Sequence, residues 1–193
     1  MAFTKTQGTS VLSTQEVAAN SQLISSVQTL ATEEQATLFF HFGKNSKQSG
    51  GPVKIRIEAS PKSSNNGFWV PIHYYTTNGG SSISTSVEGT VGSGTAVITC
   101  GSTDGFNVGD YIMIRNSTVA NSEWGRIKSI VANTSITIED NLLNAQTGSV
   151  IFSNAECYAI PVDMKSLARI RVVADGMKSS QGFVIESQLI SAV

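Results

Sequence analysis

The chain has 193 residues, of which only 14% are charged, and its 13 basic and 14 acidic residues give a formal net charge of −1. This length supports one sandwich-sized core or two small domains without disulfides or metals as staples. Nucleic acids and anionic membranes are held by an excess of lysine and arginine, which this balanced and sparse charge does not supply. We therefore expect neither nucleic acid nor a membrane as a partner.

The cysteines and the N-terminal segment indicate the cellular compartment in which the protein is made. Cys100 and Cys157 are too few for a disulfide framework and lack the spacing of metal or redox motifs, so we expect buried free thiols. Residues 1–8 contain no apolar core of a signal peptide, and no apolar run approaches the ~18 residues of a membrane span. These features predict synthesis and assembly in a cytoplasm.

Alternation of apolar and polar residues, interrupted by glycine, asparagine and serine clusters, indicates many short antiparallel strands. The clearest expected strands are 36–42, 53–59, 68–76, 111–116, 124–131, 135–139, 168–174 and 182–188. Val53, Ile55 and Ile57 alternate with charged residues, so one face of that strand should pack on a core. The sequence predicts an all-β fold in which the serine-rich segment 15–30 is extended or mixed rather than helical.

The segment from about 88 to 159 has a pattern of its own. A turn-rich stretch leads into a short expected strand at 96–100, and Gly109 and Asp110 then turn the chain into the strand at 111–116. Five or six strands of this length would close a small barrel.

Two stretches outside that segment resemble each other. Residues 55–68 and 170–183 each pass from an amphipathic strand through a Lys-Ser-Ser turn to a Gly-Phe pair. Each stretch is interpreted as a β-hairpin. The match has two possible explanations: the two stretches are equivalent hairpins of one sandwich, or the likeness between two turns arose by chance. If the two hairpins are equivalent, the sequence predicts an antiparallel β-sandwich with an inserted small β-barrel-like domain and an extended N-terminal arm. The arm would span 1–34, the sandwich 35–86 plus 161–193, and the inserted domain 87–160.

Titratable residues are too few and too scattered for a catalytic site. His41 and His73 lack a serine or cysteine in a nucleophile context and lack an acidic partner placed by sequence. The histidines and cysteines form no metal ligand set, and residues 139–141 lack the spacing of a calcium loop. Asp110 and Asp140 fit turn residues that accept local backbone N–H groups. We expect no catalytic residue, no cofactor and no metal, and a protein that is not an enzyme.

Several turn-and-strand motifs carry a family resemblance. They are NVGDYIMI at 107–114, NSEWGRIKSI at 121–130, TSITIEDNL at 134–142, GFWVPI at 67–72 and IRVVADG at 170–176. The first three resemble a small β-barrel module common in virion proteins of tailed bacteriophages, and the last two are similar to phage structural proteins with the same two-part layout. The resemblance covers most of the chain from about residue 35 onward and implies no catalytic residues.

This resemblance implies a non-enzymatic virion structural protein, and a capsid decoration or cement protein that clamps neighbouring subunits is the leading hypothesis. A neck or tail component that forms a ring, such as a connector, terminator or tail-tube subunit, is the first alternative. The second is a carbohydrate-binding module of an adsorption apparatus that uses Trp69, Tyr74 and Tyr75. The expected partners are major capsid or neck and tail proteins and further copies of this chain in a homo-oligomer, and the expected location is the virion.

The N-terminal arm and the tips of the two similar stretches are the predicted contact sites. A polar arm with few large apolar residues would gain order by lying across a neighbouring subunit. Exposed sheet edges offer a second route, because a neighbour's strand can add to them. The predicted interface residues are Lys62, Ser63, Ser64, Asn65, Asn66, Gly67, Trp69, Lys178, Ser179, Ser180, Gln181 and Gly182.

Overall fold

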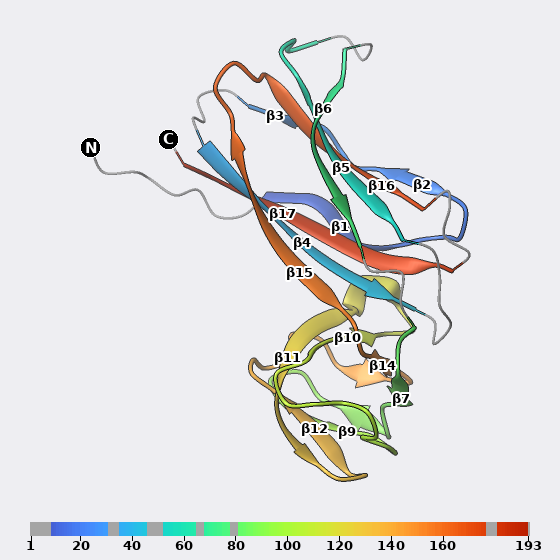
Figure 1. Ribbon diagram of the computed structural model, residues 1–193. Helices are drawn as coiled ribbons and strands as arrows, with labels where there is room; N and C mark the ends of the chain where they lie inside the picture. The colour runs from blue at the N-terminus through green and yellow to red at the C-terminus, as the bar shows by residue number, and fades with distance from the viewer. Residues whose placement is uncertain are drawn as a thin grey trace.

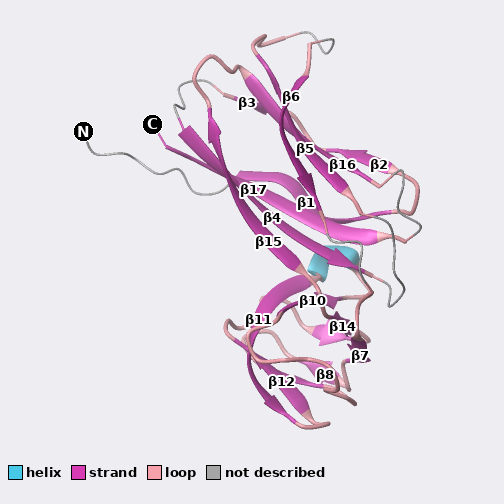
Figure 2. Cartoon of the chain, viewed as in Figure 1, coloured by secondary structure: helices cyan, strands magenta, loops and turns pink. Residues whose placement is uncertain are grey.

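The computed structural model describes residues 9–30, 35–45, 52–64, 68–77, 81–176 and 181–192, and antiparallel β-strands dominate it (Figure 1, Figure 2). Within these ranges there is no α-helix, and one 3₁₀ turn occurs at Val119–Asn121. The expected all-β fold class is confirmed.

Two antiparallel sheets form the sandwich. The first has the order β1-β17-β4-β15, and the second has the order β2-β16-β5-β6, with β3 also pairing with β16. Strands of the first sheet are β1 (Thr9–Val17), β17 (Phe183–Ala192), β4 (Gln35–Lys44) and β15 (Glu156–Asp163). Strands of the second sheet are β2 (Gln22–Ile24), β3 (Gln28–Thr29), β16 (Arg169–Asp175), β5 (Lys54–Ser60) and β6 (Val70–Thr76).

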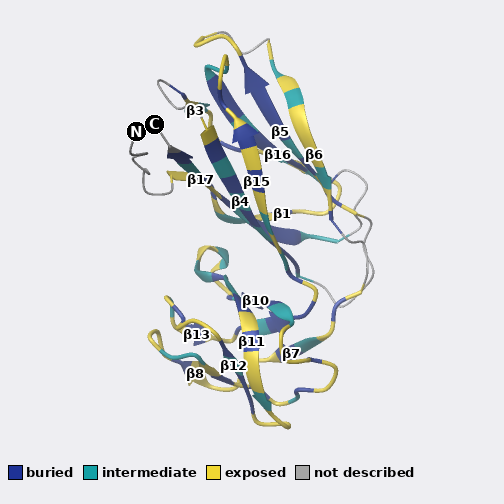
Figure 3. Cartoon of the chain, turned by 60° about the vertical axis from the view of Figure 1, so that its left-hand side comes forward, coloured by how far each residue is buried: buried dark blue, intermediate teal, exposed yellow. Residues whose placement is uncertain are grey.

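The sandwich core follows from the period-two alternation of the strands. Every second residue of β4, namely Leu38, Phe40 and Phe42, is buried and faces Ile55 and Ile57 of the opposite sheet in one apolar cluster. Buried residues gather between the two sheets, whereas β6 at one edge is largely exposed (Figure 3).

The chain between β6 and β15 forms a curled sheet with the order β7-β14-β10-β11-β12-β9. Its strands are β7 (Ser84–Ser86), β9 (Val97–Thr99), β10 (Tyr111–Arg115), β11 (Glu123–Val131), β12 (Ser135–Ile138) and β14 (Val150–Phe152), and β8 (Thr90–Val91) pairs with β13 (Gln146–Thr147) beside it. A bridge between Val87 and Cys100 links the two edges of the curl. The curl encloses a separate core that includes Ile98, Ile112 and Ile127, as expected for a barrel-like insertion.

The N-terminal residues correct the expectation of a separate arm over 1–34. Residues 9–17 form β1, which pairs with β17 from Thr9↔Leu189 to Val17↔Phe183, and β2 and β3 pair with β16. Val11, Leu12 and Val17 are buried in the sandwich core. Few apolar residues are enough here, because a strand at a sheet edge has to cover only one side of the core. Residues 1–8 and 31–34 lie outside the described residues.

The ends of the insertion also differ from the predicted 87 and 160. β7 pairs with β14 of the curled sheet, so the change of sheet precedes residue 84. β15 pairs with β4 along its whole length, so the return to the sandwich precedes residue 156.

The two similar stretches are not equivalent hairpins. Residues 54–76 do form a hairpin, in which β5 pairs with β6. β16 instead pairs with β5 in the second sheet, while the following β17 pairs with β4 and β1 in the first sheet. The likeness therefore falls on two neighbouring antiparallel strands, β5 and β16, and the strand that follows β16 along the chain, β17, lies in the other sheet.

Candidate interaction surfaces

The described sheet edges discourage strand addition. β6 and β15, the edge strands on one side of the sandwich, contain Pro71 and Pro161, which have no backbone N–H to donate. On the other side, β1 has two register irregularities and β2 and β3 are very short. Bulges and short strands protect edges in the same way. The expected route through exposed edges is therefore disfavoured, which leaves the outer faces of the sheets as contact surfaces.

The predicted interface residues divide between opposite ends of the sandwich. The antiparallel pairs Arg169↔Ser60 and Asp175↔Lys54 place the turn after β5 at one end and the turn after β16 at the other. The two predicted contact sites therefore do not form one continuous surface at a single end of the second sheet. Lys62, Ser63 and Ser64 are exposed after β5, Trp69 precedes β6, and the half-buried Gln181 and Gly182 precede β17. Asn65, Asn66, Gly67, Lys178, Ser179 and Ser180 lie outside the described residues.

Lys62 and Trp69 are brought together by an arginine from another strand. The guanidinium of Arg169 lies 4.9 Å from the ring centre of Trp69, and its Nε donates a hydrogen bond of 2.7 Å to the Lys62 carbonyl. Arg171 lies over the same ring at 4.3 Å. Guanidinium groups stack favourably on aromatic faces, so Trp69 orients two arginines on the outer face of the second sheet.

A buried carboxylate completes this arrangement. Glu58, 8% exposed, accepts hydrogen bonds from Arg171, whose Nη2 is 2.7 Å from its Oε2. The Nε of Arg56 lies 3.6 Å from the other oxygen of Glu58. We call Arg56, Glu58, Trp69, Arg169 and Arg171 the cationic face. Two of its three guanidinium groups, those of Arg56 and Arg171, contact the Glu58 carboxylate, and the third, that of Arg169, stacks on Trp69. Arg56 Nε and Trp69 Nε1 are buried without a hydrogen-bond partner among the described residues.

The proposed carbohydrate platform is not formed. Tyr74 pairs with Arg56 on the outer face and is 60% exposed, whereas Tyr75 pairs with Ile55 on the inner face. The ring of Tyr75 packs on Tyr158 of β15 with centroids 3.9 Å apart. Since Arg169 and Arg171 stack on Trp69, the three aromatic residues present no common open face for a sugar ring.

The outer face of the first sheet has a different chemistry. A shallow groove there is lined by Thr37 and Phe39 of β4, Pro161 of β15 and Ile190 of β17. A second hollow continues from Phe39 past Gln188 towards the inserted sheet. This groove is mainly apolar, so the two outer faces of the sandwich differ in charge as well as in position.

The joint between sandwich and insertion gathers several titratable groups. The ring of His41 on β4 lies 5.4 Å from Trp124 and 6.2 Å from Tyr111, both on the inserted sheet. Burial lowers the pKa of His41, and the charge of Glu186 opposes that shift. Met113 and Phe152 pack with Val184 of β17 beneath these rings.

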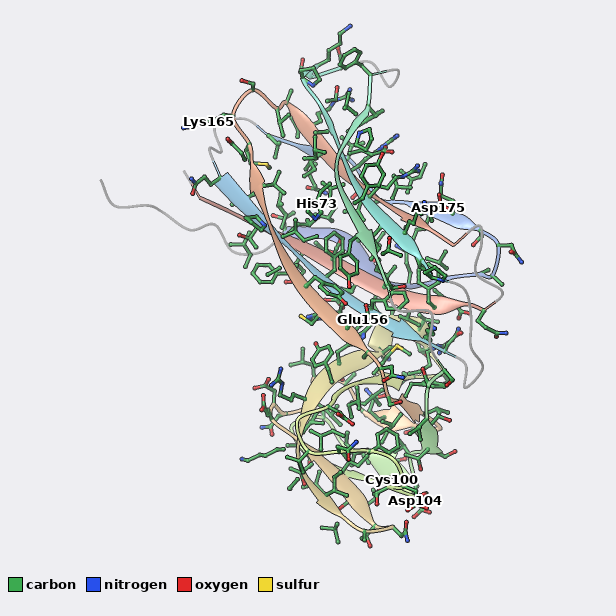
Figure 4. The ribbon with its side chains drawn as sticks, in the orientation of Figure 1. His73, Cys100, Asp104, Glu156, Lys165 and Asp175 are labelled. Carbon is green, nitrogen blue, oxygen red and sulfur yellow. The ribbon has the colours of Figure 1, made fainter. Side chains whose placement is uncertain are left out.

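The two thiols differ in their exposure. Cys100 is buried, as expected, but Cys157 is exposed on β15, which corrects that part of the expectation. Partial burial raises the pKa of the Cys157 thiol, and its hydrogen bond with Tyr111 opposes the rise. A raised pKa leaves little thiolate at neutral pH. His73 is exposed on β6, away from Cys100 (Figure 4).

A buried polar network in the insertion was not predicted. Gln146, fully buried, accepts a hydrogen bond from Asn116 and donates one to Glu123. Glu123 also accepts the backbone N–H groups of Leu143 and Asn144. Nothing in the local pattern at Gln146 signals this role, because its partners come from distant segments. By contrast, Asp110 accepts the N–H of Asn107 at 2.9 Å, and this turn role is confirmed.

Comparison with protein-family models and with curated proteins gives no match to this chain. Within the described ranges, no helix has the length and apolar character needed to cross a membrane. No group of three or more His, Cys, Asp or Glu side chains is placed to hold a metal ion in the part of the chain that the structure describes.

Proposed function

We propose that the chain is a non-enzymatic structural protein of a tailed-bacteriophage virion, where it acts as a capsid decoration or cement protein that clamps neighbouring subunits. One observation carries this proposal. The sandwich presents a cationic face on one side and a mainly apolar groove on the other, while its edges discourage strand addition. A clamp needs two separate contact surfaces on one stiff body, and the resemblance of the motifs to phage modules supports the same assignment.

The insertion suits a second point of attachment. Its packed joint with the sandwich, built from Met113, Phe152, Ala155 and Val184, favours a fixed rather than a free orientation. Cys100 and Asp104 lie towards the end of the insertion that is remote from the sandwich (Figure 4). Several weak contacts on one body, repeated over a shell, add to strong attachment through effective concentration.

A ring component of the neck or tail is the second candidate, and the difference between the two faces favours it. Head-to-tail rings require unlike surfaces on opposite sides of one subunit. The cationic face and the groove meet that requirement. The carbohydrate-binding alternative loses support, because Trp69, Tyr74 and Tyr75 do not share a face.

The test is the copy number of this protein in purified particles, measured by quantitative mass spectrometry against the major shell protein. A decoration protein is expected in a copy number comparable to the shell subunits or to the shell's junctions. A few copies per particle would support the neck or tail instead. Absence from the particles would contradict the virion assignment.

A further inference from the structure

We propose that the cationic face binds a carboxylate-rich segment of a partner protein. This inference deepens the proposed function and rests on it for the identity of the partner as another component of the assembly. It depends on three features of the second sheet: surplus positive charge, fixed geometry and access.

The surplus charge is set by strand register. On β5 and β16, alternate residues share one face, and the pairs Arg171↔Glu58 and Asp175↔Lys54 align the two strands. The outer face then carries the cations Lys54, Arg56, Arg169 and Arg171 against the carboxylates Glu58 and Asp175. A chain with a net charge of −1 thus concentrates positive charge on one sheet face.

The position of the Arg171 side chain is fixed before a partner binds. Stacking on Trp69 at 4.3 Å and bonding to Glu58 at 2.7 Å hold the Arg171 guanidinium in place. Groups that are already ordered lose less conformational entropy on binding. Planar guanidinium groups also match the two oxygens of a carboxylate.

Access remains at Arg56 and Arg171. Their side chains are 28% and 21% exposed, and Tyr74, which pairs with Arg56, is 60% exposed beside them. The buried Nε of Arg56 has no hydrogen-bond acceptor among the described residues. A carboxylate that approaches Arg56 along Tyr74 would add to the charge compensation that Glu58 provides.

An acidic protein segment fits this face better than a nucleic acid. A phosphate backbone is bound by a track of cations along its length. Here Glu58 lies between the arginines, and this carboxylate would repel phosphates that follow one another along the sheet. A segment with spaced carboxylates can contact the arginines while neutral residues pass Glu58.

The test uses the full chain and two labelled probes in fluorescence anisotropy at low salt: a short peptide of alternating glutamate and serine, and an oligothymidylate of equal charge. The test variant is Lys54→Gln with Arg56→Gln, which keeps the Arg171–Glu58 pair. The matched control is Arg126→Gln with Lys128→Gln, which removes two exposed cations from β11 of the insertion. Thermal unfolding checks that both variants fold.

We expect the peptide to bind, the test variant to weaken its affinity about tenfold, and the control to change it less than about twofold. Equal weakening in both variants, absence of peptide binding, or tighter binding of the oligothymidylate would overturn the inference. The copy number in particles is measured independently. If the protein is present in particles but does not bind the peptide, only the inference about the cationic face is contradicted. If it binds the peptide but is absent from particles, only the virion assignment is contradicted.

Discussion

The rings of His41 on β4 and Trp124 on β11 are in contact, with their centroids 5.4 Å apart and their planes tilted by 45°, which joins one strand of the sandwich to one strand of the insertion. Beneath this contact, Met113 of β10 packs with Val184 of β17. The joint therefore has an aromatic layer and an apolar layer, each formed from both parts of the chain. Its stability should decide whether the two parts act as one body.

Acid should weaken this joint through His41. Burial lowers the pKa of His41 from 6.5, so the unfolded chain takes up a proton at a higher pH than the folded chain does. Between the two pKa values the unfolded state holds more protons, and the stabilisation present above about pH 6.5 is lost as the pH falls. We expect His41→Phe to lose less thermal stability than the wild type between about pH 7.5 and about pH 5.5. Differential scanning fluorimetry over that range measures the difference.

The control for this prediction is His73→Phe, which removes a histidine that is exposed on β6. Its acid-induced loss of stability should equal that of the wild type. The role of His41 would be refuted by an equal loss in the wild type and His41→Phe.

Gly43 allows the close approach of β4 to the insertion. A Cβ atom at this position would lie 2.4 Å from the Met113 Sδ and 2.8 Å from its Cβ. Because Met113 is fully buried, Gly43→Ala is expected to destabilise the protein by about 1–3 kcal/mol through overpacking. Urea unfolding measures this change. Gly92→Ala is the control, since nothing lies within 4 Å of the added Cβ there. Similar midpoints for the two alanine variants would rule out a packed joint at Gly43.

Strands could be predicted from the sequence where apolar and polar residues alternate regularly, and they were missed where this alternation is broken. In β4, Leu38, Phe40 and Phe42 alternate without interruption, so the strand could be found. In β15, Ala159 and Pro161 place apolar residues on the outer face and conceal the alternation. β1 is hidden by its register irregularities on both sides of Leu12, which break the period of two.

The candidate surface was predictable only in part. The sequence predicts Lys62 and Trp69 as contact residues, but their shared partner, Arg169, lies on a strand about a hundred residues later. Pairing of β5 with β16 is non-local, and local pattern carries no information on which strands become neighbours. The same limit made the similar stretches at 55–68 and 170–183 look like two hairpins.

Gln146 should be the most sensitive polar position of the insertion. Its amide accepts hydrogen bonds from Asn116 and Ser149 and donates one of 3.0 Å to Glu123. Gln146→Leu keeps the approximate volume but removes these hydrogen bonds from the interior of the insertion, which should cost about 1–3 kcal/mol in urea unfolding. Gln22→Leu, at an exposed position of β2, should cost less than about 0.5 kcal/mol. If the two substitutions have equal effects, the network does not stabilise the insertion.

The two thiols should react in a fixed order, because their surroundings differ. Cys157 is exposed but its pKa is raised by partial burial, whereas Cys100 is buried and its pKa is raised by burial and then by the charge of Glu88. Iodoacetamide reacts with the thiolate, so native protein should be alkylated at Cys157 alone and more slowly than free cysteine at about pH 8. Tyr111→Phe removes the hydroxyl that hydrogen-bonds this thiol and opposes the rise of its pKa, so labelling of Cys157 should slow further. Mass spectrometry of timed samples gives both rates. Early labelling of Cys100 would show that the Val87–Cys100 bridge opens readily and that the curled sheet is not held closed.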